Sequence, residues 1–483
     1  MSRIGAQEEA RSGSTRPRSS QAPGLRQSRT RPWRHLCTRA AALTCLKPPS
    51  RGLRPPTPSL PADRFPPYIG LVALPGKDGA FLLEHCDVVL PDRLVRSGAV
   101  LAAGGKILYA GAAANLPEQI PPGCTRVSGE GSLACPALWE MHVHGCGGMS
   151  TENMSAQSLA EMARFLAGRG VGAFLPTTVA DEGYLTSLGE ALHSSTDDIR
   201  SRALGIHVEG PFVAQARRGA ISEALIRPIS AEYLDRMLSL SREKIRIMTF
   251  APELAGAVRL AERLQDLGIL PSLGHSAASY EELGPFDSVS PLSVTHLFNG
   301  MSGISHKEPG LAQWALLNKE VFTELNCDGT HVHDAGLQLA LRARPWERLI
   351  AISDAVAPAG LPRQENGGHG GAPGHAGAPG LARSLYGRPL VERGNGLYYE
   401  DTGVLVGSRC LVPDCVARLV LELSVPVASA VAMATLNPAR LLGFTRKGAL
   451  LPGYDADVAL FSRDFRRCAF LSWEGRVIHG PQV

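Results

Sequence analysis

Polar side chains that can bind a metal or transfer a proton stand at the ends of several short apolar runs. The run "ALGIHVEGP" ends in Glu209, directly before a Gly-Pro turn. Any one such residue could be structural, with a backbone partner. Their recurrence at the same end of six out of eight runs predicts instead that they meet in one site. The residues are His142, His144, Glu209, His275, His296, His331 and Asp354.

Histidine, glutamate and aspartate are the ligand types that divalent metals such as zinc bind. Glu209, His275 and His296 would provide one carboxylate and two imidazoles, leaving a coordination position open for water, which is typical of a catalytic site. A metal in such a site lowers the pKa of its bound water. His142 and His144 are two residues apart on one strand, so both side chains leave the same face and could hold a second metal.

Asp354 closes the eighth run, in "ISDAVAP". A carboxylate there can take a proton from an attacking water and return it to a leaving group, which is general acid–base catalysis. It could also be an additional metal ligand, and the two roles are compatible. We therefore expect a divalent cofactor, one or two ions per chain, with zinc as the first choice and iron, manganese or cobalt as alternatives.

The elements that must position these residues are eight apolar runs separated by amphipathic, helix-like segments. Eight strand-then-helix units favour a (β/α)₈ barrel over an open, doubly wound sheet, and the absence of a Gly-rich phosphate loop after the first run points the same way. The catalytic residues of such a barrel lie at the C-terminal ends of its strands. The runs are residues 137–145, 171–179, 203–211, 244–253, 268–276, 292–300, 322–331 and 348–358.

Other parts of the chain do not follow this alternation of strands and helices. The barrel is expected over 134–443, and residues 79–133 and 444–483 are expected to pair into a small β-sandwich domain from both chain ends. Residues 1–66 are predicted to be a disordered Arg/Ser/Pro-rich extension. The Gly/Ala/Pro/His tract at 363–383 is interpreted as a flexible insertion, although His369 and His375 could in principle touch a metal.

Charge and cysteine usage limit the partners. Residues 1–66 hold twelve arginines and one lysine against three acidic residues, whereas the whole chain has a net charge of +4, so the remainder is mildly acidic. Neither nucleic acid nor a membrane is expected as a partner, and no segment is long enough to span a bilayer. Ten scattered cysteines suggest reduced thiols. The expected location is the cytoplasm, with organelle targeting by the extension as an alternative.

The motifs, taken together, resemble the N-acetylglucosamine-6-phosphate deacetylases of the amidohydrolase superfamily. The matching stretches are "GIHVEGPF", "TFAPE", "GHSAAS", "THLFNGM", "KEPGLA", "DGTHVH" and "SDAVAPAG", in the family's order and spacing. The resemblance runs from about Gly79 to the C-terminus, without the insertion. It implies a homodimeric, metal-dependent hydrolase that converts N-acetyl-D-glucosamine 6-phosphate to glucosamine 6-phosphate and acetate.

The resemblance also assigns roles to residues. Glu209, His275 and His296 would bind the essential metal, and Asp354 would be the catalytic acid/base. Substrate would be bound by Ala220, by Asn299, by the Gly300 backbone, by Lys307, and by His331 from across a dimer interface. The His142–His144 pair matches family members that can hold two metals. Related enzymes place a carboxylated Lys at the end of strand four; "TFAPE" has none, so Glu209 would take the bridging place.

Several positions depart from the family pattern. Ile221 stands where the family usually has a His, after the small residue Ala220. Lys307 replaces a phosphate-facing Arg, which keeps the charge but loses the bidentate fork. "PALWE" replaces "PGFID", and the loop "VLVGSRCLVPD" differs from the usual one. The metal ligands are thus retained while the substrate contacts are altered.

Two other functions remain open on these grounds. The altered substrate contacts could indicate an amidohydrolase for another small amide or N-acyl compound. They could also indicate a sugar-phosphate-binding protein that has lost turnover. Acetate release from phosphorylated and unphosphorylated N-acetyl sugars would separate the first alternative from deacetylation of the sugar phosphate. Ligand binding without hydrolysis would identify the second.

Overall fold

The computed structural model describes residues 79–200, 202–363 and 384–480. The predicted extension at 1–66 lies outside the described residues, as does nearly all of the predicted insertion at 363–383, including His369 and His375.

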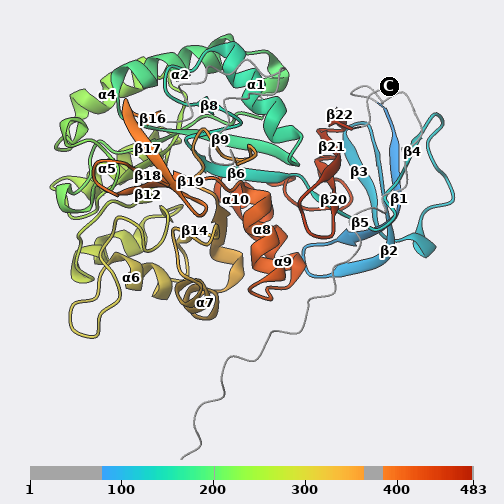
Figure 1. The fold of residues 1–483 in the computed structure, drawn as a ribbon. Coiled ribbons are helices and arrows are strands. Elements are labelled where there is room, and N and C mark those ends of the chain that lie inside the picture. Colours follow the sequence, from blue (N-terminus) through green and yellow to red (C-terminus); the bar gives the residue numbers. More distant parts are fainter. Residues whose placement is uncertain (1–78, 201, 364–383, 481–483) are drawn as a thin grey trace, which may run out of the picture. The chain divides into compact units, whose positions relative to one another are not determined.

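Eight parallel strands form one sheet in which neighbours in sequence are neighbours in space, in the order β15-β14-β13-β12-β11-β10-β9-β6 (Figure 1). The sheet closes through a parallel bridge between Val143 and Ala355. The predicted (β/α)₈ barrel is confirmed, and each strand falls within its predicted run. The strands are β6 (Leu138–Val143), β9 (Val171–Val179), β10 (Ile206–Glu209), β11 (Ile245–Phe250), β12 (Leu270–Leu273), β13 (Ser293–Val294), β14 (Phe322–Asn326) and β15 (Leu349–Ile352).

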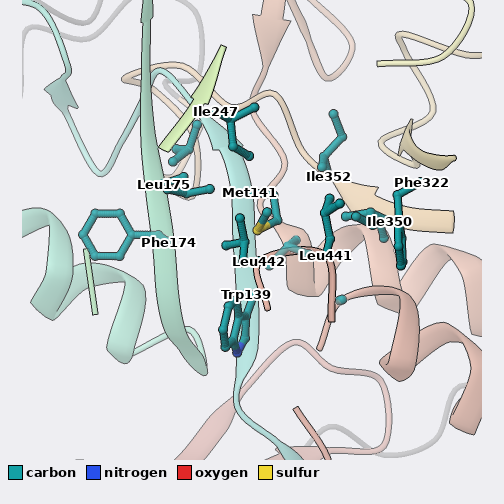
Figure 2. Close-up of a cluster of buried hydrophobic side chains, with 14 of the residues drawn as sticks. Trp139, Met141, Phe174, Leu175, Ile247, Phe322, Ile350, Ile352, Leu441 and Leu442 are labelled. Carbon is teal, nitrogen blue, oxygen red and sulfur yellow. The ribbon is translucent and has the colours of Figure 1, made fainter. Parts of the chain in front are cut away.

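Apolar side chains on these strands form the barrel core. Nearly every residue of the eight strands is buried, as expected for parallel strands covered by helices. Figure 2 shows part of this core, with Met141, Leu175, Ile247 and Ile352 pointing toward one another. Near the N-terminal end of β6, Trp139 packs against Phe444 at a ring-centroid distance of 5.4 Å.

Helices follow most of the strands, and polar caps fix where several of them start. The Ser155, Asp181 and Ser230 side chains accept hydrogen bonds from backbone N–H groups in the first turns of α1, α2 and α4. The helices are α1 (Ala156–Ala167), α2 (Glu182–Ser194), α3 (Asp197–Arg200), α4 (Ala231–Leu240), α5 (Ala257–Asp266), α6 (Leu311–Leu317), α7 (Asp334–Ala343), α8 (Val412–Leu421), α9 (Val427–Met433) and α10 (Leu436–Leu441).

Both ends of the described chain contribute to a second eight-stranded sheet, in the order β22-β21-β20-β5-β1-β2-β3, with β4 paired to β1. The predicted small β-domain built from both chain ends is therefore present. Its strands are β1 (Phe81–Val89), β2 (Leu94–Ala103), β3 (Lys106–Ala112), β4 (Thr125–Ser128), β5 (Ser132–Pro136), β20 (Val458–Ser462), β21 (Cys468–Trp473) and β22 (Arg476–His479).

A four-stranded antiparallel sheet over 384–408 was not anticipated from the sequence. It consists of β16 (Ser384–Leu385), β17 (Arg388–Arg393), β18 (Gly396–Tyr399) and β19 (Leu405–Ser408) and lies beside the barrel (Figure 1). Ser408 joins it to the end of strand β15: its N–H donates to the Asp354 carbonyl at 2.8 Å, and its carbonyl accepts from the Val356 N–H at 3.1 Å. The sheet is thereby tied to the Asp354 loop. A small β7 (Gly145–Cys146) and β8 (Met149–Ser150) hairpin follows β6.

Among the described residues, no helix combines the length and the apolar character needed to cross a bilayer.

Candidate metal and catalytic centre

Three side chains from different strands meet at the C-terminal end of the barrel. Glu209 is the last residue of β10, and His275 and His296 follow β12 and β13 by two residues each. The Glu209 Oε1 atom lies 3.0 Å from His296 Nε2 and 3.4 Å from His275 Nε2, and the two Nε2 atoms are 3.1 Å apart. These three residues, predicted from the sequence to share a metal, therefore have ligand atoms close enough to do so.

A second group of ligand atoms adjoins the first. His142 Nε2 and His144 Nε2 are 3.3 Å apart and lie 3.7 and 3.6 Å from the Asp354 Oδ1 atom. Glu209 connects the groups, since its Oε2 atom is 3.2 Å from His144 Nε2 and its Oε1 atom is 3.4 Å from His142 Nε2. Glu209 thus lies between the two groups, where the resemblance implied a bridging carboxylate.

The hydrogen-bond partners of the imidazoles decide which ring nitrogens face the centre. His142 Nδ1 is 3.2 Å from the Glu324 carboxylate, and His275 Nδ1 is 2.9 Å from the Arg217 carbonyl. Because both partners are acceptors, each Nδ1 carries the hydrogen. In the neutral rings, both Nε2 lone pairs then face the Glu209 carboxylate. Against the effect of burial, the facing carboxylates raise the pKa of His142 and of His275, so positive charge is favoured between the groups. Protons on the rings or a cation can supply this charge, and the donor set of imidazole nitrogens and carboxylate oxygens fits a divalent cation.

Unusual backbone conformations hold several of these residues. The φ angles of His275, His296 and Asp354 are 48°, 32° and 53°. They lie in the left-handed region, which residues other than glycine seldom adopt. Such conformations persist where the surroundings enforce them, often at functional sites. Gly300 also has a positive φ, 54°, and a Cβ there would lie 3.0 Å from His275 Nδ1. A side chain at this position would strain the backbone and crowd His275.

The centre is buried and rich in titratable groups. Burial alone would favour the neutral carboxyl of Glu209, but the facing histidines, His142 first, hold its pKa well below the ordinary value. Next to His142, burial and the charge of His142 lower the pKa of His207 to about 4, so this imidazole is neutral. Burial raises the pKa of Glu140 to about 7, although its carboxylate accepts hydrogen bonds from the backbone N–H groups of Ser353 and Val412.

Asp354 lies between His331 and the His142–His144 pair. Its Oδ2 atom is 3.4 Å from His331 Nε2, and the His331 Nδ1 atom is 2.9 Å from the Asp328 carboxylate. The His331 side chain is only 5% exposed and faces the Asp354 of its own chain. The resemblance implied that His331 reaches substrate across a dimer interface; in this structure it belongs to the centre of its own subunit.

The other predicted substrate residues differ in how near they lie to this centre. Gly300 contacts His275, and the Asn299 amide donates to the His296 and Leu297 carbonyls at 3.3 Å. Ala220 lines a cavity of about 390 Å³ that Tyr386 also borders. Lys307 is exposed, and its side chain makes no hydrogen bond or ion pair within the described residues.

Ile221, which replaces the usual histidine, is buried in a small apolar cluster of Val179, Val213 and itself, against which Tyr184 and Tyr386 pack. The chain therefore has an apolar cluster at the position where the family pattern has an imidazole.

Besides His207, whose ring lies 4.7 Å from that of His142, three residues at or beside the centre were not predicted from the sequence. Glu140 and Glu324 are buried carboxylates within β6 and β14, and a charged residue in an apolar run was the signal that could have identified them. The third is Tyr386, whose Oη atom is 3.0 Å from His144 Nδ1. It follows the predicted insertion and had no local signal.

The chain is similar to several known proteins. The model of the Amidohydrolase family matches residues 403–480. An N-acetylgalactosamine-6-phosphate deacetylase from Escherichia coli O157:H7 is 32% identical over 71% of this chain and 86% of its own length. An N-acetylglucosamine-6-phosphate deacetylase from Bos taurus is 31% identical over 79% of this chain and 93% of its own length. The crystal structure of N-acetylglucosamine-6-phosphate deacetylase from Thermotoga maritima has a TM-score of 0.68 and 27% identity, covering 83% of this chain and 100% of that one.

Proposed function

Because the chain belongs to the N-acetylglucosamine-6-phosphate deacetylase family of amidohydrolases, we propose that it deacetylates N-acetyl-D-glucosamine 6-phosphate with the help of a divalent metal, zinc by preference. The observation that carries the proposal is the convergence of Glu209, His275 and His296, with Asp354 beside them. The reaction breaks the amide C–N bond, forms a C–O bond from water, and yields glucosamine 6-phosphate and acetate.

The chain's own residues supply the binding and the proton transfer. Glu209, His275 and His296 would hold one cation, and His142, His144 and Asp354 would hold a second, with Glu209 shared. A cation there supplies Lewis-acid chemistry, which polarises the acetyl carbonyl and makes water more acidic. The 7% exposure of Asp354 limits competing solvent at the reacting atoms.

Asp354 is the proposed general acid–base. Its carboxylate accepts a proton from the attacking water and delivers it to the amine nitrogen as the C–N bond breaks. His331 contacts the other carboxylate oxygen, so it orients Asp354, while Asp328 holds His331 in turn. This chain of contacts directs Oδ1 toward the histidines that would bind metal.

The test is acetate release by the Asp354→Asn variant, because asparagine keeps the shape but cannot accept the proton. Turnover should fall about 10²–10⁴-fold, the usual range for a lost general acid–base. The cation held by Glu209, His275 and His296 should remain bound, as elemental analysis would show. Undiminished turnover in this variant would rule out the role given to Asp354.

A different substrate is the second candidate, favoured by the buried Ile221 and the exposed Lys307. Acetate release should be compared for N-acetylglucosamine 6-phosphate, its C4 epimer N-acetylgalactosamine 6-phosphate and unphosphorylated N-acetylglucosamine. The proposal predicts the highest kcat/KM for the first. Preference for the epimer would move the assignment to the activity named for the Escherichia coli relative, and equal rates with and without phosphate would point to another amide.

A further inference from the structure

Tyr386 occupies a turn position that its residue type does not favour. Strands β16 and β17 pair at Leu385 and Arg388, so Tyr386 and Gly387 form the whole turn between them. Their φ angles are 52° and 73°. A two-residue hairpin turn with two positive φ values favours Asn, Asp or Gly at its first position, and a bulky aromatic residue is strained there. The turn therefore does not explain the tyrosine.

The side chain of Tyr386 is fixed on several sides. Its ring stacks on Tyr184 with centroids 5.8 Å apart and planes at 27°, and it meets His144 edge-on at 6.5 Å and 88°. Ile221 belongs to the same apolar cluster. The Tyr386 backbone N–H donates to the Glu152 carboxylate. These contacts aim the phenol at His144 Nδ1, which is 3.0 Å from Oη.

The position of this hydroxyl matters because His144 faces the centre with its other nitrogen. His144 Nε2 lies 3.2 Å from Glu209 Oε2 and 3.3 Å from His142 Nε2. It can bind a cation only if it carries a lone pair, which places the hydrogen on Nδ1. The partners of His142 and His275 are pure acceptors, whereas His144 has a phenol, which can accept or donate. The phenol oxygen is the acceptor that this nitrogen needs.

We propose that Tyr386 is a positioning residue for the second metal site: its oxygen accepts the hydrogen of His144 Nδ1 and holds Nε2 toward Glu209 and Asp354. The strained turn serves this contact, because the β16–β17 hairpin brings Tyr386 to His144, the residue directly after β6 and 242 positions earlier in the chain. The inference rests on the proposed function only in taking His142, His144 and Asp354 as a metal site. Partners of this kind typically change metal affinity 10–100-fold.

The experiment titrates metal-free full-length protein with Zn²⁺ against a chromophoric chelator, for the parent chain and for Tyr386→Phe. Phenylalanine keeps the ring and its stacking but removes the oxygen. The parent should bind two equivalents; in the variant the second equivalent should bind about 10–100-fold more weakly and the first as before. Tyr184→Phe, which removes a hydroxyl from the stacked neighbour, is the matched control and should leave both affinities unchanged.

A second variant separates the loss of the hydroxyl from an effect of the substitution on the turn. Tyr386→Asn suits the turn better but cannot reach His144, so its second affinity should fall as in Tyr386→Phe. A parent that binds one equivalent, or unchanged second-site affinity in both variants, would overturn the inference whatever the catalytic activity. If the second affinity falls but N-acetylglucosamine 6-phosphate is not hydrolysed, the proposed function fails and the role of Tyr386 stands.

Discussion

The described chain holds one cluster of buried charge at the barrel rim and another in the β-domain around Lys447. The Lys447 ammonium lies 3.1 Å from Asp455, 3.0 Å from Asp457 and 3.2 Å from Glu474, and 4.1 Å from the centroid of the Trp473 ring. Its side chain is 8% exposed. The positive charge that faces these carboxylates thus belongs to the chain itself.

The rim centre is built differently. Among the described residues, Glu209 and Asp354 form ion pairs with histidines and with no lysine or arginine. Histidines contribute positive charge only when protonated, and neutral ones offer lone pairs instead. The Lys447 cluster can therefore serve the fold by itself, whereas the rim centre is suited to receive a cation from outside. Variants should separate these two roles.

The largest effect is expected from Glu209→Gln, which keeps the size of the side chain and removes the carboxylate shared by four histidines. Bound metal should be lost, and acetate release should fall by more than about 1,000-fold, since losing a direct ligand costs more than losing an outer partner. Metal content and turnover check this. Glu190→Gln is the control: Glu190 is exposed and paired with Arg242, so both quantities should stay at parent values. Retained metal in Glu209→Gln would contradict the proposal that the rim centre binds a cation through this carboxylate.

Lys447→Met should come next and should act on stability. It removes the cation that faces Asp457 and Glu474 and leaves Asp455 with Lys106 alone. Breaking a buried ion pair from one side costs about 3–5 kcal/mol of unfolding free energy. Lys106→Met is the matched control, because Lys106 also pairs with Asp455 but its side chain is 42% exposed. It should cost at most about 1 kcal/mol.

Chemical denaturation of both lysine variants measures these differences. Equal losses in the two variants would show that the buried cation has no special part in the fold.

A smaller effect is expected in the pH dependence of stability. Burial raises the pKa of Asp457 to about 6, against the opposing effect of Lys447, whereas the ordinary value is 3.8. The folded chain therefore holds this proton to a higher pH than the unfolded chain, and stability falls as the pH rises from 4 to 6. The contribution is roughly 2–3 kcal/mol, since one pKa unit corresponds to about 1.4 kcal/mol.

Asp457→Asn removes this titration, so unfolding free energies of parent and variant should be compared at pH 4, 5, 6 and 7. The parent should lose stability relative to the variant up to about pH 6 and not beyond. A difference that is constant across this range would contradict the raised pKa.

The sequence predicted the parts of the molecule that local patterns encode. Apolar runs of strand length revealed all eight barrel strands, and the residue types at their ends revealed Glu209, His275 and His296. This worked because parallel strands in a closed barrel bring their C-terminal ends to one rim, so strand position alone places the side chains together.

The parts that escaped prediction depend on contacts between distant segments. The β16–β19 sheet has strands of two to six residues, and its turn signals, such as "YG" and "GNG", follow directly on the Gly-rich tract. Tyr386 meets His144 only after this sheet has docked at the Asp354 loop. For His331 the strand-end pattern predicted a place at the rim with Asp354, whereas the resemblance implied a contact across a dimer interface; in the structure its Nε2 atom lies 3.4 Å from Asp354 of its own chain.

The most direct test of the account is to measure metal content and acetate release on the same preparation of the purified chain, before and after chelation and again after Zn²⁺ is restored. One or two equivalents of metal should accompany hydrolysis of N-acetylglucosamine 6-phosphate, both should vanish with the chelator, and both should return with Zn²⁺. Undiminished hydrolysis by protein shown to be free of metal would contradict the claim that Glu209, His275 and His296 form a catalytic metal site.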